Sequence, residues 1–457
     1  MSASYLDPTG PPRLAEAPAR PLRTLLGIGL GNAMEWFDWT AYAVFAPFFA
    51  AQIFNPADPS AALLSSFAVF GAGFVIRPFG AIAFGWLTDR RGRKVSLIAA
   101  VLCASLGMLL IAVVPTYGSA GLFAGVILLI ARLLQGIAHT GEVAAAYTYI
   151  AEVAPARRRG LWASSIYVSG VGAILVATVI GAVFTTLLSH TEMTTWGWRI
   201  PFVLGAALGL LTLVLRRTME ESGAFTQQSR EPRPAAGKTS LSGGLWANRA
   251  AGVRVFALTA ANAVFFYAWA VSGPSWAISV AGLDPTSALW AGVVALAVCI
   301  VALPALGALS DRIGRRPNFC LFGVGVAVLA FPLDRLARGG QVWQFGLAMT
   351  IALILFAFIG SIFPALLAEL FPTGVRASGI ALPYSLAAVA FAGTAPYLQQ
   401  WLSRRGDGDA FVAYTAAVAL LGAAVMYVTR ETRGVDLGGP PTGVLAGDDA
   451  RMEAGTR

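Results

Sequence analysis

The sequence predicts an all-α membrane protein with twelve transmembrane helices in two six-helix bundles related by pseudo-two-fold symmetry. Three observations support this fold class: the composition is strongly apolar, the apolar residues occur in long blocks, and two motifs recur at nearly one offset. Hydrophobic residues make up 57% of the 457 residues and charged residues only 12%, about half the charged fraction of an ordinary soluble domain. So few charges cannot cover the water-facing surface of a soluble protein of this size.

The apolar blocks have the length that a membrane-spanning helix needs. Residues 97–114 and 256–280 contain no charged side chain, and about 20 apolar residues suffice to cross the hydrocarbon core. The same pattern predicts twelve helices, near residues 24–53, 61–88, 95–115, 119–151, 161–189, 199–215, 251–280, 286–309, 317–333, 342–369, 377–402 and 409–429. The polar stretches predict a disordered tail over 1–22, bundles over 23–215 and 251–430, a linker over 216–250, and a second tail over 431–457.

The basic residues are distributed unevenly between the two sides of the membrane. With the amino terminus in the cytoplasm, 25 of the 32 Lys and Arg residues lie on the cytoplasmic side and five on the opposite side. This positive-inside bias predicts a multi-pass protein of the plasma (inner) membrane with both termini in the cytoplasm. The bias also accounts for the net charge of +9, so the charge does not indicate binding to nucleic acid.

Two sequence motifs recur in the two halves. The ten residues from Gly85 to Lys94 recur as Gly307 to Arg316, with an offset of 222. A second motif recurs with an offset of 217, which pairs Glu152 with Glu369, Pro155 with Pro372 and Arg159 with Arg376. Recurrence of both motifs indicates parallel repeats of six helices, an arrangement that places a binding site between the halves near the bilayer midplane.

These motifs resemble those of the major facilitator superfamily. The loop motif and its copy carry the resemblance, together with Arg132, Gln135 and Gly136 in the fourth predicted helix. Segments 31–38, 77–80 and 196–202 resemble its metabolite:proton symporter family, which includes bacterial transporters for alpha-ketoglutarate, citrate, shikimate, and proline or betaine. The resemblance extends from about residue 25 to residue 429, and it implies transport by alternating access.

Ionisable side chains inside the membrane are the candidates for coupled chemistry. A charge at the centre of a membrane helix costs about 2.5–3.5 kcal/mol on translocon scales, so it persists where it faces a cavity or a partner. The first half contains six such residues: Glu35, Asp38, Arg77, Arg132, His139 and Glu142. The spacing of Arg132, Gln135, His139 and Glu142 places all four on one face of a helix.

We interpret Asp38 as the proton carrier and Arg132 as its ionic partner, because the resemblance places their helices on the central cavity. Protonation of Asp38 would release Arg132 to bind a substrate carboxylate, and Glu35, His139 and Glu142 complete the predicted coupling group. The predicted substrate-binding residues are Arg132, Gln135, Asn32, Tyr42, Arg77, Asn262, Tyr267 and Tyr384. The alternatives are a permanent ion pair, an interfacial arginine at Arg77, and aromatic residues that only pack.

The repeated motifs predict a cytoplasmic gate, which the resemblance implies is closed while the site faces outward. Asp89 can accept hydrogen bonds from arginines or face a helix amino terminus, while Glu152 can pair with Arg93, and Glu369 with Arg315. Gly85 allows close helix packing, and Gly92 allows a tight turn. The predicted gate comprises Gly85, Asp89, Arg90, Gly92, Arg93, Glu152, Arg159, Asp311, Arg315, Glu369 and Arg376.

The expected function is proton-coupled symport of a small organic acid, such as alpha-ketoglutarate or a related carboxylate. The alternatives are symport of a zwitterion such as proline or betaine, an efflux antiporter, and a membrane-embedded enzyme or channel. Residues 161–189 lack the proline that the resemblance associates with drug antiporters. The sequence contains no Walker lysine motif and only two His, so we expect no enzyme, no metal and no cofactor beyond the coupling proton. We expect a monomer in the lipid bilayer.

Overall fold

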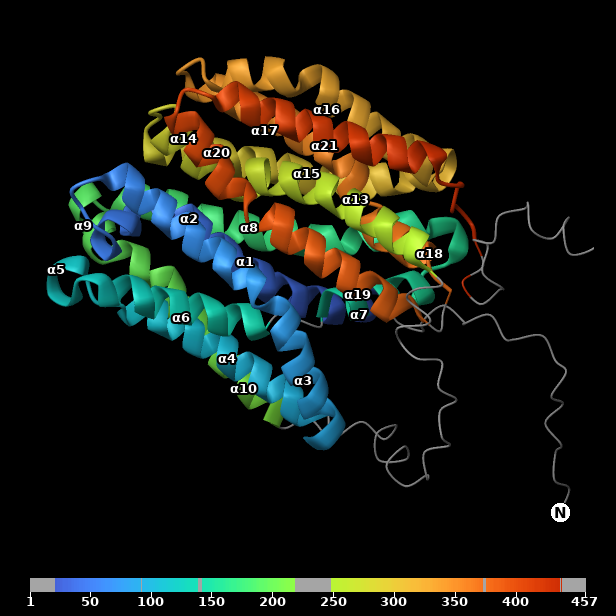
Figure 1. The fold of residues 1–457 in the computed structure, drawn as a ribbon, viewed down its shortest axis with the longest axis horizontal. Coiled ribbons are helices and arrows are strands. Elements are labelled where there is room, and N and C mark those ends of the chain that lie inside the picture. Colours follow the sequence, from blue (N-terminus) through green and yellow to red (C-terminus); the bar gives the residue numbers. More distant parts are fainter. Residues whose placement is uncertain are drawn as a thin grey trace, which may run out of the picture.

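The structure is a computed structural model, and it describes residues 21–91, 93–138, 142–217, 248–372, 375–435 and 437. The regular secondary structure of these residues is helical. Most helices run along the long axis of the molecule (Figure 1). The helices of the first half, coloured blue to green, occupy one side of the bundle, and those of the second half, coloured yellow to red, occupy the other.

The first half contains six membrane-length segments, two of which are divided into shorter helices. The segments are α1 (Pro21–Ile53), α2 (Pro59–Val75) with α3 (Arg77–Arg91), α4 (Arg93–Val113), α6 (Leu122–Ala138) with α7 (Glu142–Val153), α8 (Arg159–Leu187) and α10 (Ile200–Arg217). Short elements connect them: α5 (Tyr117–Ala120), η1 (Ala156–Arg158), α9 (His190–Thr195) and η2 (Gly197–Arg199).

The second half also contains six membrane-length segments, three of which are divided. They are α13 (Arg249–Phe266) with the π-helical turn η3 (Tyr267–Val271) and α14 (Gly273–Ser279), α15 (Pro285–Ile313), α16 (Arg315–Ala337), α17 (Val342–Gly360) with α18 (Phe363–Glu369), α19 (Arg376–Ala387) with the π-helical turn η5 (Ala388–Ala392) and α20 (Ala395–Arg404), and α21 (Gly408–Val428). The packing repeats as well, since α4 contacts α6 and α10 just as α16 contacts α17 and α21.

Proline explains four of the breaks that the sequence prediction left as continuous helices. Pro78, Pro274, Pro364 and Pro396 each occupy the second position of the helix that follows a break. Proline has no backbone N–H and fits the first turn of a helix, where that donor has no partner within the helix. The breaks therefore lie where the chain can start a new helix without losing a hydrogen bond.

The described helices have the length and composition of membrane spans. Among the described residues, eight helical segments are long and apolar enough to cross a membrane, and three shorter apolar helices accompany them at Ile98–Val113, Leu122–Ala138 and Gly197–Leu211. Together with the 33-residue α1, they account for the twelve predicted spans. Large apolar side chains on the outside, such as Ile82, Leu122 and Val428, are more than 70% exposed, as expected of a lipid-facing surface.

Close backbone contacts hold the two halves together along α8 and α15. A Cβ atom added to Gly160 would lie 2.7 Å from the carbonyl oxygen of Gly307, and one added to Gly307 would lie 2.8 Å from the carbonyl oxygen of Gly160. Glycine is therefore required at both positions. Gly314, which occupies the place of Gly92 in the second copy of the loop motif, has a φ of +107° in the tight turn between α15 and α16.

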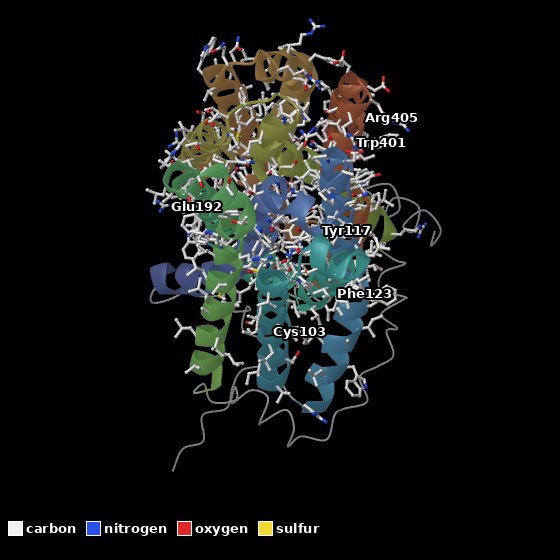
Figure 2. The ribbon with its side chains drawn as sticks, turned by 90° about the vertical axis from the view of Figure 1, so that its left-hand side faces the viewer. Cys103, Tyr117, Phe123, Glu192, Trp401 and Arg405 are labelled. Carbon is white, nitrogen blue, oxygen red and sulfur yellow. The ribbon has the colours of Figure 1, made fainter. Side chains whose placement is uncertain are left out.

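The two ends of the bundle differ in character. At one end lie Arg159, Arg315 and Arg376, at the starts of α8, α16 and α19; we call this the arginine end. At the opposite end lie α5, α9 and the end of α20 (Figure 1). Figure 2 views the molecule from this opposite end, where Tyr117 and Glu192 are labelled.

Candidate functional site

A buried ion pair lies in the first half, where α1 meets α3. Oε1 of Glu35 and Nη2 of Arg77 are 3.5 Å apart, and both side chains are less than 10% exposed. The guanidinium of Arg77 also lies over the rings of Trp39 and Phe74, at 4.6 and 4.4 Å from their centroids. Removing one partner of such a buried pair destabilises a protein by about 3–5 kcal/mol, because the other charge is left buried and uncompensated. Arg77 is therefore anchored inside the bundle and not at its surface.

Arg132 on α6 is fully buried and carries an open edge of hydrogen-bond donors. Its Cζ lies 4.0 Å from the ring centroid of Trp39 and 4.5 Å from that of Tyr42, and its Nη1 donates to Oε1 of Gln135 at 2.7 Å. Among the described residues, Nε and Nη2 of Arg132 and Nε2 of Gln135 have no hydrogen-bond partner. Nε and Nη2 form one edge of the guanidinium, which matches the two oxygens of a carboxylate.

The sequence predicted a direct ion pair between Asp38 and Arg132, and this pair is not among the ion pairs that join described residues. On this part of α1, Glu35 forms an ion pair with Arg77. The physical reason is that Arg132 donates to Gln135 and stacks on the α1 rings. Asp38 is nevertheless 9% exposed and within electrostatic range of Arg132. Direct pairing of these two groups therefore requires a rearrangement of the side chains.

Asn32 and Tyr42, which were predicted to bind substrate, make hydrogen bonds within the protein. Nδ2 of Asn32 donates to the carbonyl oxygen of Ile166 at 2.8 Å and to Oγ of Ser169 at 2.9 Å, and its Oδ1 accepts from Trp36 at 3.0 Å. The hydroxyl of Tyr42 donates to a backbone carbonyl of α2 at 2.9 Å. In this conformation both side chains stabilise the packing of α1 against its neighbours.

The three predicted substrate-binding residues of the second half lie at the interface with the first half. Tyr267 in η3 and Tyr384 on α19 are both within electrostatic range of Arg77. Asn262 on α13 is buried, and its Nδ2 donates to the hydroxyl of Tyr167 on α8 at 2.9 Å. Side chains from both halves therefore surround one central region, as the repeat arrangement predicts.

Part of the predicted site lies outside the described residues. Gly85 lies within α3. The described part excludes Gly92 and His139 and the side chains of Asp89, Arg90, Arg93 and Glu142. Their assigned roles stay predictions.

Trp39 is a central residue that the sequence analysis missed. Its ring centroid lies 4.6 Å from the guanidinium carbon of Arg77 and 4.0 Å from that of Arg132, so one ring contacts both cations. The sequence does contain a signal, because Trp39 lies one helical turn after Glu35 and directly follows Asp38. An aromatic ring is able to hold a buried guanidinium through a cation–π interaction.

Two ion pairs join the halves at the arginine end. Nη1 of Arg159 lies 3.1 Å from Oε1 of Glu369, and Nη1 of Arg376 lies 2.6 Å from Oε1 of Glu152. Each arginine pairs with the acid of the other repeat, as a two-fold axis requires. The carboxylate of Glu152 thus bonds Arg376 across the interface, while its predicted pair with Arg93 stays a prediction, because the side chain of Arg93 lies outside the described part of the chain.

The predicted pair of Glu369 with Arg315 is present, at 3.4 Å, and Asp311 extends this network. The carboxylate of Asp311 accepts from Nη1 of Arg315 at 2.9 Å and from the backbone N–H groups of Gly160 and Leu161 at 2.8 and 2.9 Å. These two N–H groups open α8, so the carboxylate faces the positive end of the helix dipole. Asp311 thus shows both interactions predicted for its repeat counterpart Asp89.

The residues after the last membrane helix cover this network. Oγ1 of Thr432 donates to Oε2 of Glu369 at 2.7 Å, and the carboxylate of Glu431 accepts from the backbone N–H of Arg315 at 2.8 Å. Two backbone carbonyls of residues 435–437 accept from Arg159 and Arg376 at 3.1 and 3.0 Å. The predicted tail over 431–457 therefore begins with a segment that bonds to both halves.

The halves also meet at the opposite end. Oγ of Ser275 on α14 donates to the backbone carbonyl of Ala43 on α1 at 2.5 Å, and Arg404 at the end of α20 lies 3.4 Å from Asp58 before α2. Sequence analysis missed these contacts because none belongs to a repeated motif. The two halves are therefore in contact at both ends of the bundle.

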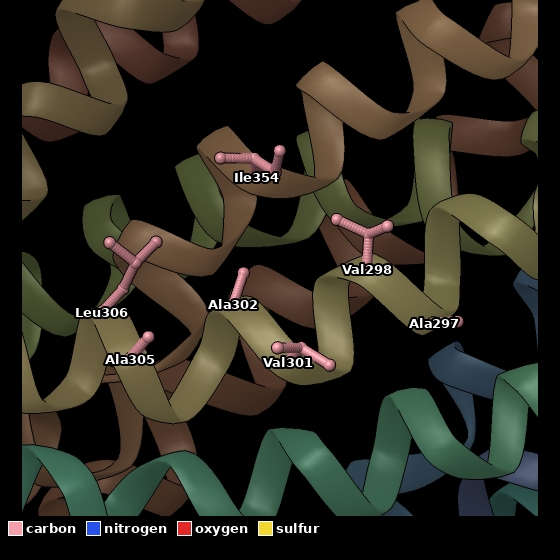
Figure 3. A pocket seen from close by; sticks show the side chains of 7 residues that line it. All are labelled: Ala297, Val298, Val301, Ala302, Ala305, Leu306 and Ile354. Carbon is pink, nitrogen blue, oxygen red and sulfur yellow. The ribbon is translucent and has the colours of Figure 1, made fainter.

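An apolar hollow of about 570 Å³ lies away from this centre. Its walls come from α15 and α17 (Figure 3): Ala297, Val298, Val301, Ala302, Ala305, Leu306 and Ile354. None of these side chains offers a hydrogen bond or a charge. The hollow therefore fits lipid chains and does not fit a polar solute.

A helical membrane bundle of two related halves, with charges buried between them and contacts at both ends, defines a secondary transporter. The chain belongs to the Major Facilitator Superfamily, because the model of that family matches residues 28–382. The prediction from the sequence motifs is confirmed, and the protein is a membrane transporter and not an enzyme.

Similar proteins include transporters for several small molecules. The alpha-ketoglutarate permease of Escherichia coli (strain K12) is 36% identical over 421 residues, which cover 92% of this chain and 96% of that protein. The citrate-proton symporter of Klebsiella pneumoniae is 30% identical, with 92% of this chain and 95% of that protein covered. A putative proline/betaine transporter of Staphylococcus haemolyticus is also 30% identical, with 91% and 89% covered.

Among solved structures, the chain has the fold of the xylose transporter XylE from E. coli. The partially occluded inward open conformation of that protein matches with a TM-score of 0.73 and 20% sequence identity, over 92% of this chain and 100% of the other. At this level of identity the match establishes the fold alone.

Proposed function

We propose that this chain is a proton-coupled symporter that imports a small organic acid by alternating access. The observation that carries the proposal is the open edge of Arg132, a fully buried cation whose Nε and Nη2 have no partner among the described residues. A buried guanidinium with unused donors is unfavourable, and a substrate carboxylate satisfies both donors at once. Nε2 of Gln135 supplies a third donor beside them.

Asp38 couples this site to the proton. When Asp38 is ionised, it competes with the substrate for the positive field of Arg132, within whose range it lies. When Asp38 is protonated, that competition ends and the anion binds. Proton and anion therefore enter the site together, and the charge of the buried cluster changes little during transport.

The networks at the two ends supply the alternating access. The ion pairs of Glu369 and Glu152 close the arginine end, and the contacts of Ser275 and Asp58 close the opposite end. The positive-inside distribution of arginines supports a cytoplasmic arginine end, with both termini in the cytoplasm. The proposed transporter acts as a monomer and uses no cofactor other than the proton.

A second candidate is symport of a zwitterion such as betaine. One observation favours it: four aromatic rings gather next to the charged cluster, with centroids 5.1 Å apart for Trp36 and Phe266, 6.4 Å for Trp36 and Tyr267, and 5.9 Å for Tyr167 and Phe266. Aromatic cages bind quaternary ammonium groups through cation–π contacts. The likeness to a putative proline/betaine transporter supports this candidate as well.

The experiment that separates the candidates uses purified protein in liposomes. Uptake of labelled alpha-ketoglutarate is measured with an inward proton gradient, with and without an uncoupler, and with excess citrate or betaine as competitor. The proposal predicts accumulation above the equilibrium level, loss of accumulation with the uncoupler, and no competition by betaine. Uptake that stops at equilibrium would contradict proton coupling, and accumulation of betaine instead of an acid would favour the second candidate.

A further inference from the structure

Three tyrosine hydroxyls form a neutral polar group at the interface of the halves. The ring of Tyr147 on α7 lies 6.0 Å from that of Tyr384 on α19, and the ring of Tyr167 on α8 packs on the same phenylalanine, Phe363, as that of Tyr147. Tyr167 in turn accepts from Nδ2 of Asn262 at 2.9 Å. The three tyrosines and Asn262 thus join two helices of the first half, α7 and α8, to two of the second, α19 and α13.

The surroundings of this group are aromatic and closed. The ring of Tyr147 lies 6.3 Å from Phe363, and that of Tyr167 lies 5.5 Å from Phe356, while both tyrosines are 2% exposed. Oδ1 of Asn262 is buried without a hydrogen-bond partner among the described residues. A buried acceptor without a donor is unfavourable, and a hydrogen-bond donor on a bound molecule would satisfy it.

The tyrosine group borders the charged cluster. Tyr384 is within electrostatic range of both Arg77 and Glu35, and Tyr267 is within range of Arg77 and Arg132. A small molecule held at Arg132 therefore has a cationic wall from α3 and α6 and a wall of neutral hydroxyls from α7, α8 and α19. The two walls demand different groups on the substrate.

Resting on the proposed transport of an organic acid, we infer that Tyr147 and Tyr167 are specificity-determining residues that bind an oxygen function remote from the carboxylate held by Arg132. Tyrosine hydroxyls donate hydrogen bonds to keto, hydroxyl or carboxylate oxygens. The substrate class is therefore an acid with a second oxygen-bearing group. A simple monocarboxylate satisfies only the arginine wall, and a trimethylammonium group has no use for the hydroxyls.

Replacement of tyrosine by phenylalanine tests this inference, because it keeps the ring and removes only the hydroxyl. Tyr147→Phe and Tyr167→Phe are each compared with the wild type in liposomes for KM and maximal rate with alpha-ketoglutarate. Pentanoate, which has the same chain length and a single carboxylate, is measured as an inhibitor. Tyr414→Phe is the matched control, since Tyr414 lies on α21 and packs on Phe411, outside the site.

We expect KM for alpha-ketoglutarate to rise about tenfold in both site variants, as expected for loss of one hydrogen bond to a charged or strongly polar group. The maximal rate and the inhibition constant of pentanoate stay within twofold of the wild-type values, and the control variant behaves as the wild type. A fall in maximal rate with unchanged KM would show that the tyrosines serve only the gate and would overturn the inference. Unchanged kinetics in both variants would overturn it too.

Failure of the inference is distinguishable from failure of the proposed function. If the wild type transports no organic acid, the proposed function is wrong and the inference falls with it. If the wild type accumulates alpha-ketoglutarate but both phenylalanine variants retain its KM, only the inference is wrong. If betaine is the substrate and both variants carry it normally, the rings act as a cation cage and the hydroxyls have no role in recognition.

Discussion

Glu369→Gln is the substitution that should most strongly weaken the closed arginine end. The Glu369 carboxylate is fully buried and accepts from Arg159, Arg315 and Thr432 at 3.1, 3.4 and 2.7 Å. Removing one partner of a buried ion pair costs about 3–5 kcal/mol, and about 1.4 kcal/mol corresponds to a factor of ten. When the arginine end opens, water can solvate Arg159 and Arg315, so the cost of the unpaired charges falls on the closed state alone. Glu369→Gln should therefore shift the equilibrium between the closed and open states toward the open state by about two orders of magnitude.

Labelling of a single cysteine measures this shift. Ser164 on α8 is 2% exposed next to the network, and Ser164→Cys is introduced into a background without Cys103, Cys299 and Cys320. We expect a water-soluble maleimide to label this cysteine at least ten times faster in the Glu369→Gln background. Asp334→Asn is the control, because it breaks an ion pair at the other end of α16. An unchanged labelling rate with Glu369→Gln would refute the assignment of Glu369 to the gate.

Three further substitutions test separate parts of the account. Arg132→Lys keeps the charge but loses the paired donors, so KM for a dicarboxylate in liposome uptake should rise at least tenfold; an unchanged KM would exclude bidentate binding. Asp311→Asn weakens the contact with the start of α8, which is worth about 0.3–1 kcal/mol. The turnover rate of transport should therefore fall more than the affinity for substrate, and a normal turnover rate would count against a role of Asp311 in the gate. Asp58→Asn keeps the cap on Ala61 but loses the charge facing Arg404; we expect a Tm within about 2 °C of the wild type, since exposed pairs contribute little, and a larger fall would show that this pair holds the halves together.

Sequence reasoning predicted the spans well, because a continuous apolar block allows few other structures. It missed the helix breaks, although Pro78 and Pro364 mark them, since a long apolar window does not show where one helix ends and the next begins. The close contact of Gly160 with Gly307 was only half predicted. The loop motif indicates close packing at its own glycine but does not identify the opposing residue.

Ion-pair partners were the least predictable part of the site. The repeat places Glu152 and Arg376 in equivalent motifs, yet only a two-fold axis through the interface shows that they bond across it. Inside the membrane, Glu35 bonds Arg77, while Asp38 lies within electrostatic range of Arg132 without a direct ion pair between these two groups. The sequence places these four charges in the first half but does not show which acid bonds which arginine.

The Asp38→Asn variant in liposomes is the most direct test of proton coupling through the first half. Two rates are compared with the wild type: uptake driven by an imposed pH gradient, and exchange of labelled for unlabelled acid without a gradient. The account predicts that gradient-driven accumulation disappears while exchange persists, because Arg132 still binds the anion. Gradient-driven accumulation at the wild-type level would contradict the account and place the proton on another group.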